Sequence, residues 1–435
     1  MRVAVIGGGI SGIASAFYLV KRQIKVDIFE SKKQIGGRAG SDLLNDRWVD
    51  FGGKNIGRNY NLFRDFAKSC GNPDFEYFGI NTSQLINGRI ITISREKSSL
   101  LNFLKVVNLC GLRAMGRLYP HIKAILDDRS SGVLCSEYFR TLSEKFDHLT
   151  LDQYLKGRCS NNVIRPITIR MNGAEPEECY PGNFGSNLAL ALDSFEQLSI
   201  GMHDLLGTFI TNHEPESLKI LTGSRVTSVT KNQNGFRVDY THRGTPGTAS
   251  YNKVISALPA HDLAELLQDN LPETAGFLRE VNYYPVGIAI VKYRNEVFPA
   301  TRRAMVFDRN SPLSNAGAYG LKDLNLARYT FSGKASRKKI TKHSSPKEVI
   351  ELAEKIASPY FNIENNPKEA HVYRYFPKGL CAYSSKHHQL LEAVDKSISS
   401  FSGFGTTGDY RRGASIEACF RSAKECVENV MGDRS

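Results

Sequence analysis

Three glycines and a glutamate near the N-terminus have the types and spacing of a dinucleotide-binding site. Gly7, Gly9 and Gly12 satisfy the pattern G-x-G-x-x-G, and Glu30 follows at close to the roughly 20 residues expected of an acid that binds a ribose. The first glycine allows a tight turn, the second lets a pyrophosphate approach the backbone, and the third lets a helix pack closely on a strand. A helix that begins at such a turn offers free N–H groups to phosphates. These four residues therefore predict a dinucleotide site.

The flanking residues predict the elements that position this site. Residues 2–6 are a short β-branched run typical of a buried parallel strand, residues 13–20 continue as a helix, and residues 26–29 form a second strand that ends at Glu30. Strand, turn, helix, strand and acid stand in the order of a βαβ unit. This order favours a dinucleotide site over a glycine turn that only connects a strand to a helix.

Later glycine motifs indicate which dinucleotide is bound. In chain order they are Gly36-Gly37-Arg38, Asp50-Phe51-Gly52-Gly53, and the run 403–408 that leads into Asp409 and residues 413–418. In these motifs the sequence resembles the flavoprotein family of amine oxidases, protoporphyrinogen oxidases and phytoene-type desaturases. The motifs run from one end of the chain to the other. The resemblance implies that the cofactor is FAD rather than NAD.

The resemblance also implies which residues hold the FAD. Asp409 would bond the ribityl chain, a helix beginning near Ser415 would point its N-terminus at the flavin pyrimidine, and Val226 would meet the adenine. No cysteine or histidine stands at an evident attachment motif, so we expect the FAD to be non-covalent. The expected cofactor-binding residues are Gly7, Gly9, Ile10, Ser11, Gly12, Glu30, Ser31, Gly37, Arg38, Gly53, Lys54, Asn55, Val226, Gly408, Asp409, Ser415 and Ile416.

The catalytic residues are unknown at this stage, because a flavin itself supplies the hydride-accepting atom. Many amine oxidases of the family place a lysine of a core strand near flavin N5, and in the matching strand, 286–293, that position is Ile288. Lys292 lies on the same face about 13 Å away, at about 3.3 Å per residue. Trp48 is the only tryptophan, so an aromatic amine cage would have to use tyrosines. Both observations favour a desaturase or C–C oxidase over an amine oxidase.

Three residues are weak candidates for the flavin-facing surface. Tyr383 lies in the stretch 371–387, which resembles the R-W…P-x-Y-x-x-G-H segment of the porphyrinogen-oxidase and desaturase branch, with Lys386 in place of the glycine. Asn55 and Arg58 follow the D-x-G-G block and could face the substrate. Structural roles, as a core tyrosine and as solvated loop residues, are equally open for them.

Several functions are therefore open. The first is an FAD-dependent oxidoreductase that dehydrogenates a C–C bond of an apolar or cyclic metabolite. The second is an amine or amino-acid oxidase, and the third is a flavin-fold binding protein without redox activity. The retained glycines, together with Glu30, Arg38 and Asp409, disfavour the third. A sugar mutase that uses flavin without net redox change is a further option.

The placement of the motifs predicts an α/β fold with a discontinuous Rossmann-type FAD-binding domain. The intervening segments would form a second, α+β substrate domain with a helical insert. The expected order is FAD-binding domain over 1–85, helical part of the substrate domain over 86–200, FAD-binding domain over 201–265, sheet part of the substrate domain over 266–384, and FAD-binding domain over 385–435. Within these segments we expect strands over 221–229, 236–240, 251–259 and 283–293, and helices over 98–126, 133–158 and 347–357.

Composition limits the other partners. The chain has 435 residues, is 41% hydrophobic and carries a formal charge of +13, but its basic residues are spread out and form no recognised nucleic-acid module. Eight scattered cysteines without C-x-x-C read as reduced thiols, and no His/Cys cluster predicts a metal. Because the first expected strand begins at residue 2, we expect no signal peptide. We expect a cytoplasmic protein that acts on a small-molecule or carrier-bound substrate, while its oligomeric state stays unknown.

One segment suggests a peripheral membrane contact. Between residues 98 and 126, leucines recur near helical spacing, and Lys105, Arg113, Arg117 and Lys123 add positive charge without an acid. A basic amphipathic helix can lie on an anionic membrane surface. The alternative is that the leucines pack on the substrate domain and the basic residues are solvated.

Overall fold

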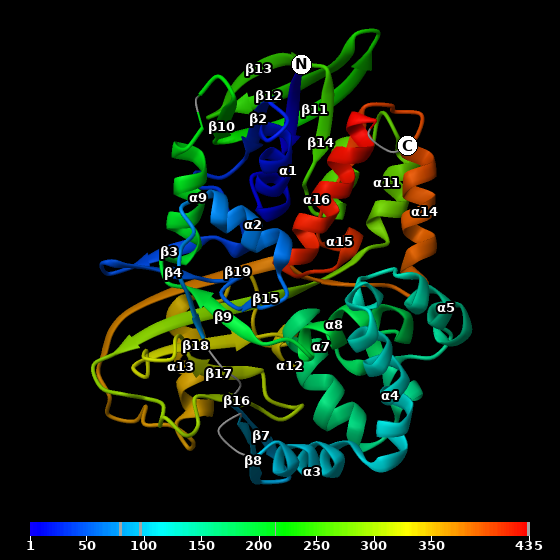
Figure 1. Ribbon diagram of the computed structural model, residues 1–435. Helices are drawn as coiled ribbons and strands as arrows, with labels where there is room; N and C mark the ends of the chain where they lie inside the picture. The colour runs from blue at the N-terminus through cyan, green and yellow to red at the C-terminus, as the bar shows by residue number, and fades with distance from the viewer. Residues whose placement is uncertain (78–80, 95–97, 214, 433–435) are drawn as a thin grey trace.

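The computed structural model describes residues 1–77, 81–94, 98–213 and 215–432. Figure 1 shows a dinucleotide-binding region at the top, a large sheet at the lower left and a group of helices at the lower right. The chain enters the upper region at its beginning, in its middle and at its end. The expected α/β architecture with a discontinuous Rossmann-type domain is confirmed.

The upper region is built on a five-stranded parallel sheet. Its strands, in spatial order, are β10 (Leu218–Thr222), β2 (Lys25–Glu30), β1 (Arg2–Ile6), β14 (Lys253–Ser256) and β20 (Phe404–Thr406). The β1 side chains from Val3 onward are buried, as expected of a strand covered on both faces. Because the β1 register aligns Ile6 with both Phe29 and Ser256, the carboxyl ends of these strands meet at one edge. Ligands of open α/β sheets bind at that edge.

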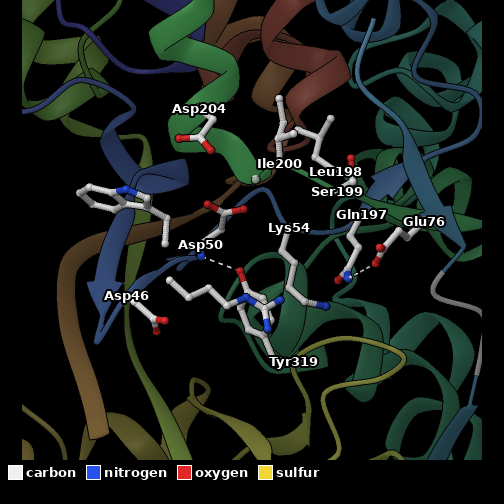
Figure 2. A pocket seen from close by; sticks show the side chains of 13 residues that line it. Asp46, Asp50, Lys54, Glu76, Gln197, Leu198, Ser199, Ile200, Asp204 and Tyr319 are labelled. Carbon is white, nitrogen blue, oxygen red and sulfur yellow. Dashed lines mark hydrogen bonds between the residues drawn. The ribbon is translucent and has the colours of Figure 1, made fainter.

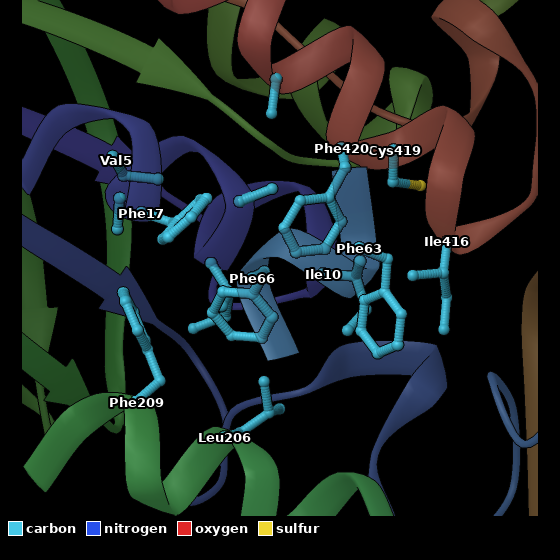
Figure 3. Packing of buried hydrophobic residues seen from close by; sticks show 14 of the residues in the cluster. Val5, Ile10, Phe17, Phe63, Phe66, Leu206, Phe209, Ile416, Cys419 and Phe420 are labelled. Carbon is cyan, nitrogen blue, oxygen red and sulfur yellow. The ribbon is translucent and has the colours of Figure 1, made fainter. Parts of the chain in front are cut away.

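An aromatic core fixes four helices on one face of this sheet. They are α1 (Ile10–Val20), α2 (Asn61–Ser69), α9 (Gly201–Thr211) and α16 (Ile416–Met431). Phe17, Phe66, Phe209 and Phe420, one from each helix, pack edge to face or tilted at ring distances between 5.2 and 6.5 Å (Figure 3). Helices from both ends of the chain are thereby held around α1.

A three-stranded antiparallel sheet covers the other face. It consists of β11 (Ser224–Asn232), β12 (Gly235–His242) and β13 (Thr245–Tyr251). The strand expected over 221–229 is in fact divided, because Gly223 adopts a left-handed φ of 68° between β10 and β11. Helices α10 (Ala260–Leu267), α11 (Pro272–Arg279) and α14 (His387–Ile398) complete this side.

The second region contains a seven-stranded mixed sheet. Its spatial order is β19 (Lys368–Ala382), β15 (Asn282–Tyr293), β18 (Leu326–Phe331), β17 (Asn315–Ala318), β16 (Ala304–Val306), β7 (Asn81–Ile86) and β8 (Arg89–Ser94). The first strand along the chain that belongs to this sheet is β7, which begins at residue 81. Helix α13 (Pro346–Ala357) covers one face and begins with a capping box between Ser345 and Glu348. The other face meets the hairpin of β3 (Ser41–Leu44) and β4 (Arg47–Asp50).

Short helices form the third group. They are α3 (Ser99–Cys110), α4 (Leu112–Asp127), α5 (Glu137–Phe146), α6 (Leu151–Leu155), α7 (Arg165–Met171) and α8 (Phe184–Ala191). The helix expected over 98–126 is broken at Gly111, whose φ is 85°, and the helix expected over 133–158 is divided into α5 and α6. The remaining elements are β5 (Ile56–Gly57), β6 (Phe75–Tyr77), β9 (Phe195–Leu198), α12 (Lys334–Arg337) and α15 (Asp409–Arg412). Among the described residues, no helix is long and apolar enough to cross a bilayer.

Candidate functional site

The glycine turn between β1 and α1 leaves an open position for a ligand. A Cβ on Gly12 would lie 1.9 Å from the carbonyl oxygen of Gly7, so that position excludes every side chain. A Cβ on Gly9, in contrast, would meet nothing within 4 Å, so the backbone there is open. No side chain caps α1, and the N–H groups of its first turn, which Ile10 and Ser11 begin, stay available. This arrangement fits a pyrophosphate.

Glu30 is held rigidly beside this turn. Its carboxylate accepts hydrogen bonds from the backbone N–H groups of Gly8 and Lys32, each at 2.8 Å, and from the Ser31 hydroxyl at 3.4 Å. A carboxylate offers about four lone-pair sites, so capacity remains for ribose hydroxyls. The side chain of Val226 packs partly buried against the cluster that contains Phe29, next to Glu30. Ser31 and Val226 thus lie at the end of β2, where the adenosine part is expected.

The second glycine pair is pressed against the first. The N–H of Gly36 donates to the carbonyl of Gly8 at 2.8 Å, and a Cβ on Gly37 would lie 3.1 Å from Cα of Gly9. Arg38 follows, and its Nη1 donates to Oδ2 of Asp409 at 2.6 Å. Burial alone would lower the pKa of Arg38, but the charge and hydrogen bond of Asp409 together with Tyr283 raise the pKa above its usual value. The N-terminal and C-terminal motifs therefore join in one ion pair.

The C-terminal helix closes the site from the other side. The Ser415 hydroxyl caps α16 by accepting from the N–H of Ala418 at 3.1 Å. Gly53 has a left-handed φ of 70°, and a Cβ there would approach Ile416 Cδ1 to 2.7 Å. The D-x-G-G block therefore packs directly on the start of α16, and Gly408 precedes Asp409 beside it. The expected cofactor residues of four distant segments thus surround one site whose donors and open backbone fit FAD.

The three candidate catalytic residues are placed differently. The Tyr383 hydroxyl donates to the carbonyl of Asp409 at 3.1 Å, so this buried residue supports the C-terminal flavin motif. Asn55 is exposed and accepts from Lys54 Nζ at 3.5 Å. Arg58 forms an ion pair with Glu196 at 2.8 Å and lies over the ring of Tyr77. The structure brings Tyr383 and Asn55 to the motifs that surround the flavin site, while Arg58 is engaged with β9 and β6.

The strand position that carries a lysine in many amine oxidases holds a buried aliphatic residue. Ile288 is 5% exposed and pairs with Thr330 of β18 and Arg374 of β19. Lys292 instead forms an ion pair with Glu369 at 3.3 Å. Trp48 stacks on His203 of α9, with ring centres 3.6 Å apart, and therefore supports the β4–α9 contact.

A pocket of about 320 Å³ opens beside Lys54. Lys54, Asp50 and Tyr319 stand together in its wall (Figure 2), and the Tyr319 hydroxyl accepts from the N–H of Asp50 at 2.6 Å. The carboxylate of Asp50 accepts from the N–H of Met202 at 3.2 Å and so caps the start of α9. Burial, together with the charge of Arg328, lowers the pKa of Lys54 to about 7.

Two arginines whose charges act on Lys54 lie outside the motifs that the sequence shows. Burial and the charge of Arg170 lower the pKa of Arg328 to about 10, although Tyr319 acts in the opposite direction. The charge of Arg170 also lowers the pKa of Lys54, while the charges of Asp323 and Asp50 act in the opposite direction. The three cationic residues come from α7, from β18 and from the D-x-G-G block, and no spacing in the sequence connects them. Among the described residues, no group of three or more His, Cys, Asp or Glu side chains could hold a metal ion.

Comparisons with known proteins agree with this geometry. The profile of the family described as flavin containing amine oxidoreductase matches residues 10–431. Protoporphyrinogen oxidase 2 of Arabidopsis thaliana is 21% identical, with 99% of this chain and 94% of that protein covered. Zeta-carotene desaturase of Synechocystis sp. is 39% identical over 76 residues, which are 16% of this chain and 14% of that one. The solved structure of cyclohexylamine oxidase from Brevibacterium oxydans IH-35A has a TM-score of 0.73 at 13% identity, with 99% of both chains covered.

The profile match spans nearly the whole chain, including helix α1 after the glycine turn, the D-x-G-G block and the C-terminal motif that surround the site. The chain therefore belongs to the flavin containing amine oxidoreductase family and is an FAD-dependent oxidoreductase.

Proposed function

We propose that the protein dehydrogenates a C–C bond of an apolar or cyclic metabolite, as desaturases and C–C oxidases do. The observation that carries this proposal is Ile288, a buried aliphatic side chain at the position where many amine oxidases hold a lysine. Val286 and Ile290 extend the same apolar face of β15, and Phe51 and Phe376 pack against it. A water-poor, apolar surface suits removal of hydrogens from carbon.

The residues of the chain would bind and orient the reactants. FAD, when bound, supplies the hydride acceptor at N5. The turn from Gly7 to Gly12 would hold the pyrophosphate, Glu30 the ribose, and Asp409 with Arg38 the ribityl side. The aliphatic face around Ile288 would exclude water from the reacting carbon atoms.

The charge of Lys54 beside the flavin motifs disfavours an amine substrate. Lys54 is partly cationic at neutral pH, and an alkylamine is itself a cation there. A positive charge beside a bound amine opposes its binding. The similarity to a protoporphyrinogen oxidase over 99% of the chain supports the same preference. An amine or amino-acid oxidase and a redox-inactive flavin-binding protein are the alternatives.

Anaerobic mixing with a panel of reductants tests the proposal. Porphyrinogens and partly saturated polyenes should bleach the flavin absorbance, whereas primary amines and amino acids should leave it unchanged. FAD-free protein serves as the background control. Bleaching by an amine or amino acid and by no C–C substrate would identify the second function. A flavin that dithionite reduces, but no member of the panel does, would favour the binding protein.

A further inference from the structure

Two cysteines that are far apart in the sequence meet inside the group of short helices. Cys110 is the last residue of α3, and Cys159 directly precedes a π-helical turn, Ser160–Ile164. Their sulfur atoms are 2.6 Å apart, although 49 positions separate the two residues. The Asn162 side chain joins the same two segments, since it donates to the carbonyl of Leu109 at 3.4 Å. The contact between the two sulfur atoms therefore belongs to the packing of both segments.

The two thiols are placed as the formation of a disulfide requires. A disulfide holds its sulfur atoms at about 2.0 Å, so the atoms need to approach one another by only about 0.6 Å. Both thiols are free, and both residues are buried in an apolar cluster that includes Ala114, Leu155 and Ile164. Among the described residues, no group of three or more His, Cys, Asp or Glu side chains could hold a metal ion, so the pair is not part of a metal site.

Arg158 makes the two thiols unequal. The three heavy atoms nearest to a Cβ placed on Gly111 all belong to the Arg158 guanidinium group, the first at 3.4 Å, so this group lies beside the residue that follows Cys110. Burial raises the pKa of Cys110, while the hydrogen bond with Cys159 and the charge of Arg158 act in the opposite direction. For Cys159, burial and the neighbouring Cys110 both raise the pKa. Cys110 is therefore the thiol that ionises more readily, and the thiolate is the form that reacts with oxidants.

The chain turns sharply directly after Cys110. Gly111 has a left-handed φ of 85° and lies between α3 and α4, which Figure 1 shows at the bottom and at the lower right of the molecule. Gly111 is half-buried and has no side chain, and Arg158 beside it is exposed. At this corner a small oxidant can therefore reach Cys110 after a local movement of the Arg158 side chain.

We propose that Cys110 and Cys159 are a site of reversible disulfide formation, in which a peroxide oxidises Cys110 and Cys159 then completes the bond. With hydrogen peroxide, the Cys110 sulfur attacks one oxygen, the O–O bond breaks, and a sulfenic acid and water form. The Cys159 sulfur attacks the sulfenic sulfur, which forms the S–S bond and releases a second water. In total, two thiols lose two electrons and two protons, and one peroxide becomes two water molecules. A small thiol such as glutathione reverses the reaction by thiol–disulfide exchange.

The disulfide would fix the corner between α3 and α4 to the segment that leads into α7. The π-helical turn after Cys159 continues directly into α7, and the Ser332 hydroxyl at the end of β18 donates to the carbonyl of Ile169 in α7 at 2.8 Å. The bond would also close a long loop of chain, which restricts the unfolded state. The oxidised protein should therefore melt several degrees higher than the reduced protein.

Counting thiols in the FAD-loaded wild type tests the proposal without a substrate. The protein is reduced, desalted and treated with a small excess of hydrogen peroxide, and the remaining thiols are labelled with N-ethylmaleimide after unfolding. Two of the eight cysteines should lose their label, peptide mapping should recover Cys110 linked to Cys159, and dithiothreitol should restore both labels. Cys135 is the internal control, because it is partly exposed whereas the other seven cysteines are buried. Oxidation that only follows exposure would therefore modify Cys135 first.

Variants assign the two roles. Cys159→Ser should trap a sulfenic acid on Cys110, which dimedone labels, whereas Cys110→Ser should leave Cys159 unlabelled by dimedone. Arg158→Gln should slow disulfide formation several-fold, and Arg113→Gln, at an exposed position of α4, should not change the rate. FAD content and melting temperature are measured for each variant.

Three results would overturn the proposal. The first is eight labelled thiols in the wild type after peroxide treatment, and the second is a loss of label at Cys135 while Cys110 and Cys159 keep theirs. The third is equal dimedone labelling of the two serine variants. Because the first two results come from the wild type, they do not depend on the folding of any variant.

Discussion

Arg38 and Asp409 stand 371 positions apart in the sequence and form an ion pair of 2.6 Å in the structure. The same Asp409 carboxylate accepts from the Tyr283 hydroxyl at 3.0 Å, and its carbonyl accepts from Tyr383 at 3.1 Å. One aspartate therefore joins the N-terminal segment, the large sheet and the C-terminal helix. Because the flavin site lies where these parts meet, loss of this residue should weaken FAD binding more than it weakens the folding of each part.

We expect Asp409→Ala to weaken retention of FAD more than Asp409→Asn does. The alanine variant removes every partner of Arg38 and Tyr283 on this side chain, whereas asparagine keeps one acceptor. Hydrogen bonds to charged groups contribute about 1.5–3 kcal/mol, or roughly 10- to 150-fold in affinity. The dissociation constant of FAD for the apoprotein measures the effect, and equal affinities of both variants and the wild type would exclude this role.

Glu30→Ala should also weaken FAD binding, for a different physical reason. The carboxylate holds the N–H groups of Gly8 and Lys32, so its removal loosens the glycine turn and deletes the ribose acceptor together. A loss of affinity within the same range of roughly 10- to 150-fold is expected. Glu351→Ala, at an exposed position of α13, is the matched control and should keep full occupancy. Unchanged flavin content of Glu30→Ala after extensive dilution would count against the assignment.

Gly12→Ala should abolish FAD binding, while Gly207→Ala should preserve it. A Cβ at residue 12 would lie 1.9 Å from a backbone oxygen, whereas a Cβ at residue 207, within α9, would meet nothing within 4 Å. Alanine in a helix interior is favoured over glycine by roughly 0.5–1 kcal/mol, so the second variant should be slightly more stable. Flavin content and melting temperature of the two purified variants check this pair. A yellow Gly12→Ala protein would refute the packing argument.

Local patterns made part of this structure predictable from the sequence. The turn at Gly12 and the helix expected over 347–357 depend on neighbours within a few residues, and the structure has both, the helix as α13. The position of Lys386 shows the limit of such patterns. It replaces a glycine of the family pattern and still adopts a left-handed φ of 52°, because the surrounding packing determines the backbone there.

The contact of Arg328 with the D-x-G-G block could not be predicted from the sequence, for a related reason. Its guanidinium donates to the carbonyl of Phe51 at 2.6 Å only because β18 packs beside that block. Similarly, residues 81–86 join that sheet by parallel pairing with β16, whose partner residues Met305 and Val306 lie far along the chain. Contacts of this kind depend on tertiary register, which no local spacing encodes.

Stability should fall as the pH drops from 6.5 toward 4, in part because of His387. This buried histidine donates from Nε2 to the carbonyl of Tyr410 at 2.7 Å, and among the described residues its Nδ1 has no partner that could accept a second proton. Burial lowers its pKa from 6.5 to about 4. The unfolded chain therefore takes up a proton that the folded chain refuses within this window, and unfolding is favoured as the pH falls.

Replacing the histidine isolates its share of this effect. At about 1.4 kcal/mol per pKa unit, the contribution is at most about 3 kcal/mol. His387→Gln keeps a donor near Nε2 and cannot titrate, so its melting temperature should fall less between pH 6.5 and 4 than that of the wild type. His343→Gln, at an exposed position, should follow the wild type. Parallel curves for His387→Gln and the wild type would show that the pKa of the ring is the same in the folded and unfolded chains.

The last prediction concerns the surface of α3 and α4. Leu100, Leu101, Phe103 and Leu104 are each more than half exposed, and Leu112 is 78% exposed. Leu109 and Leu118 of the same segment are buried, so part of the segment packs on the protein while these five side chains stay exposed. An exposed apolar patch of this kind marks an interaction surface, and the basic residues of α4 add attraction for anionic lipids.

We expect the protein to sediment with anionic vesicles at low salt and to be released as salt increases, because screening weakens the electrostatic part. Leu104→Glu should reduce sedimentation, since it places a negative charge in the apolar patch facing an anionic surface. Leu321→Glu, at another exposed leucine outside these helices, is the matched control and should sediment like the wild type. Equal sedimentation of both variants would show that the vesicles bind elsewhere on the protein. If the wild type does not sediment, the exposed patch does not bind membranes, and a protein partner becomes the alternative occupant.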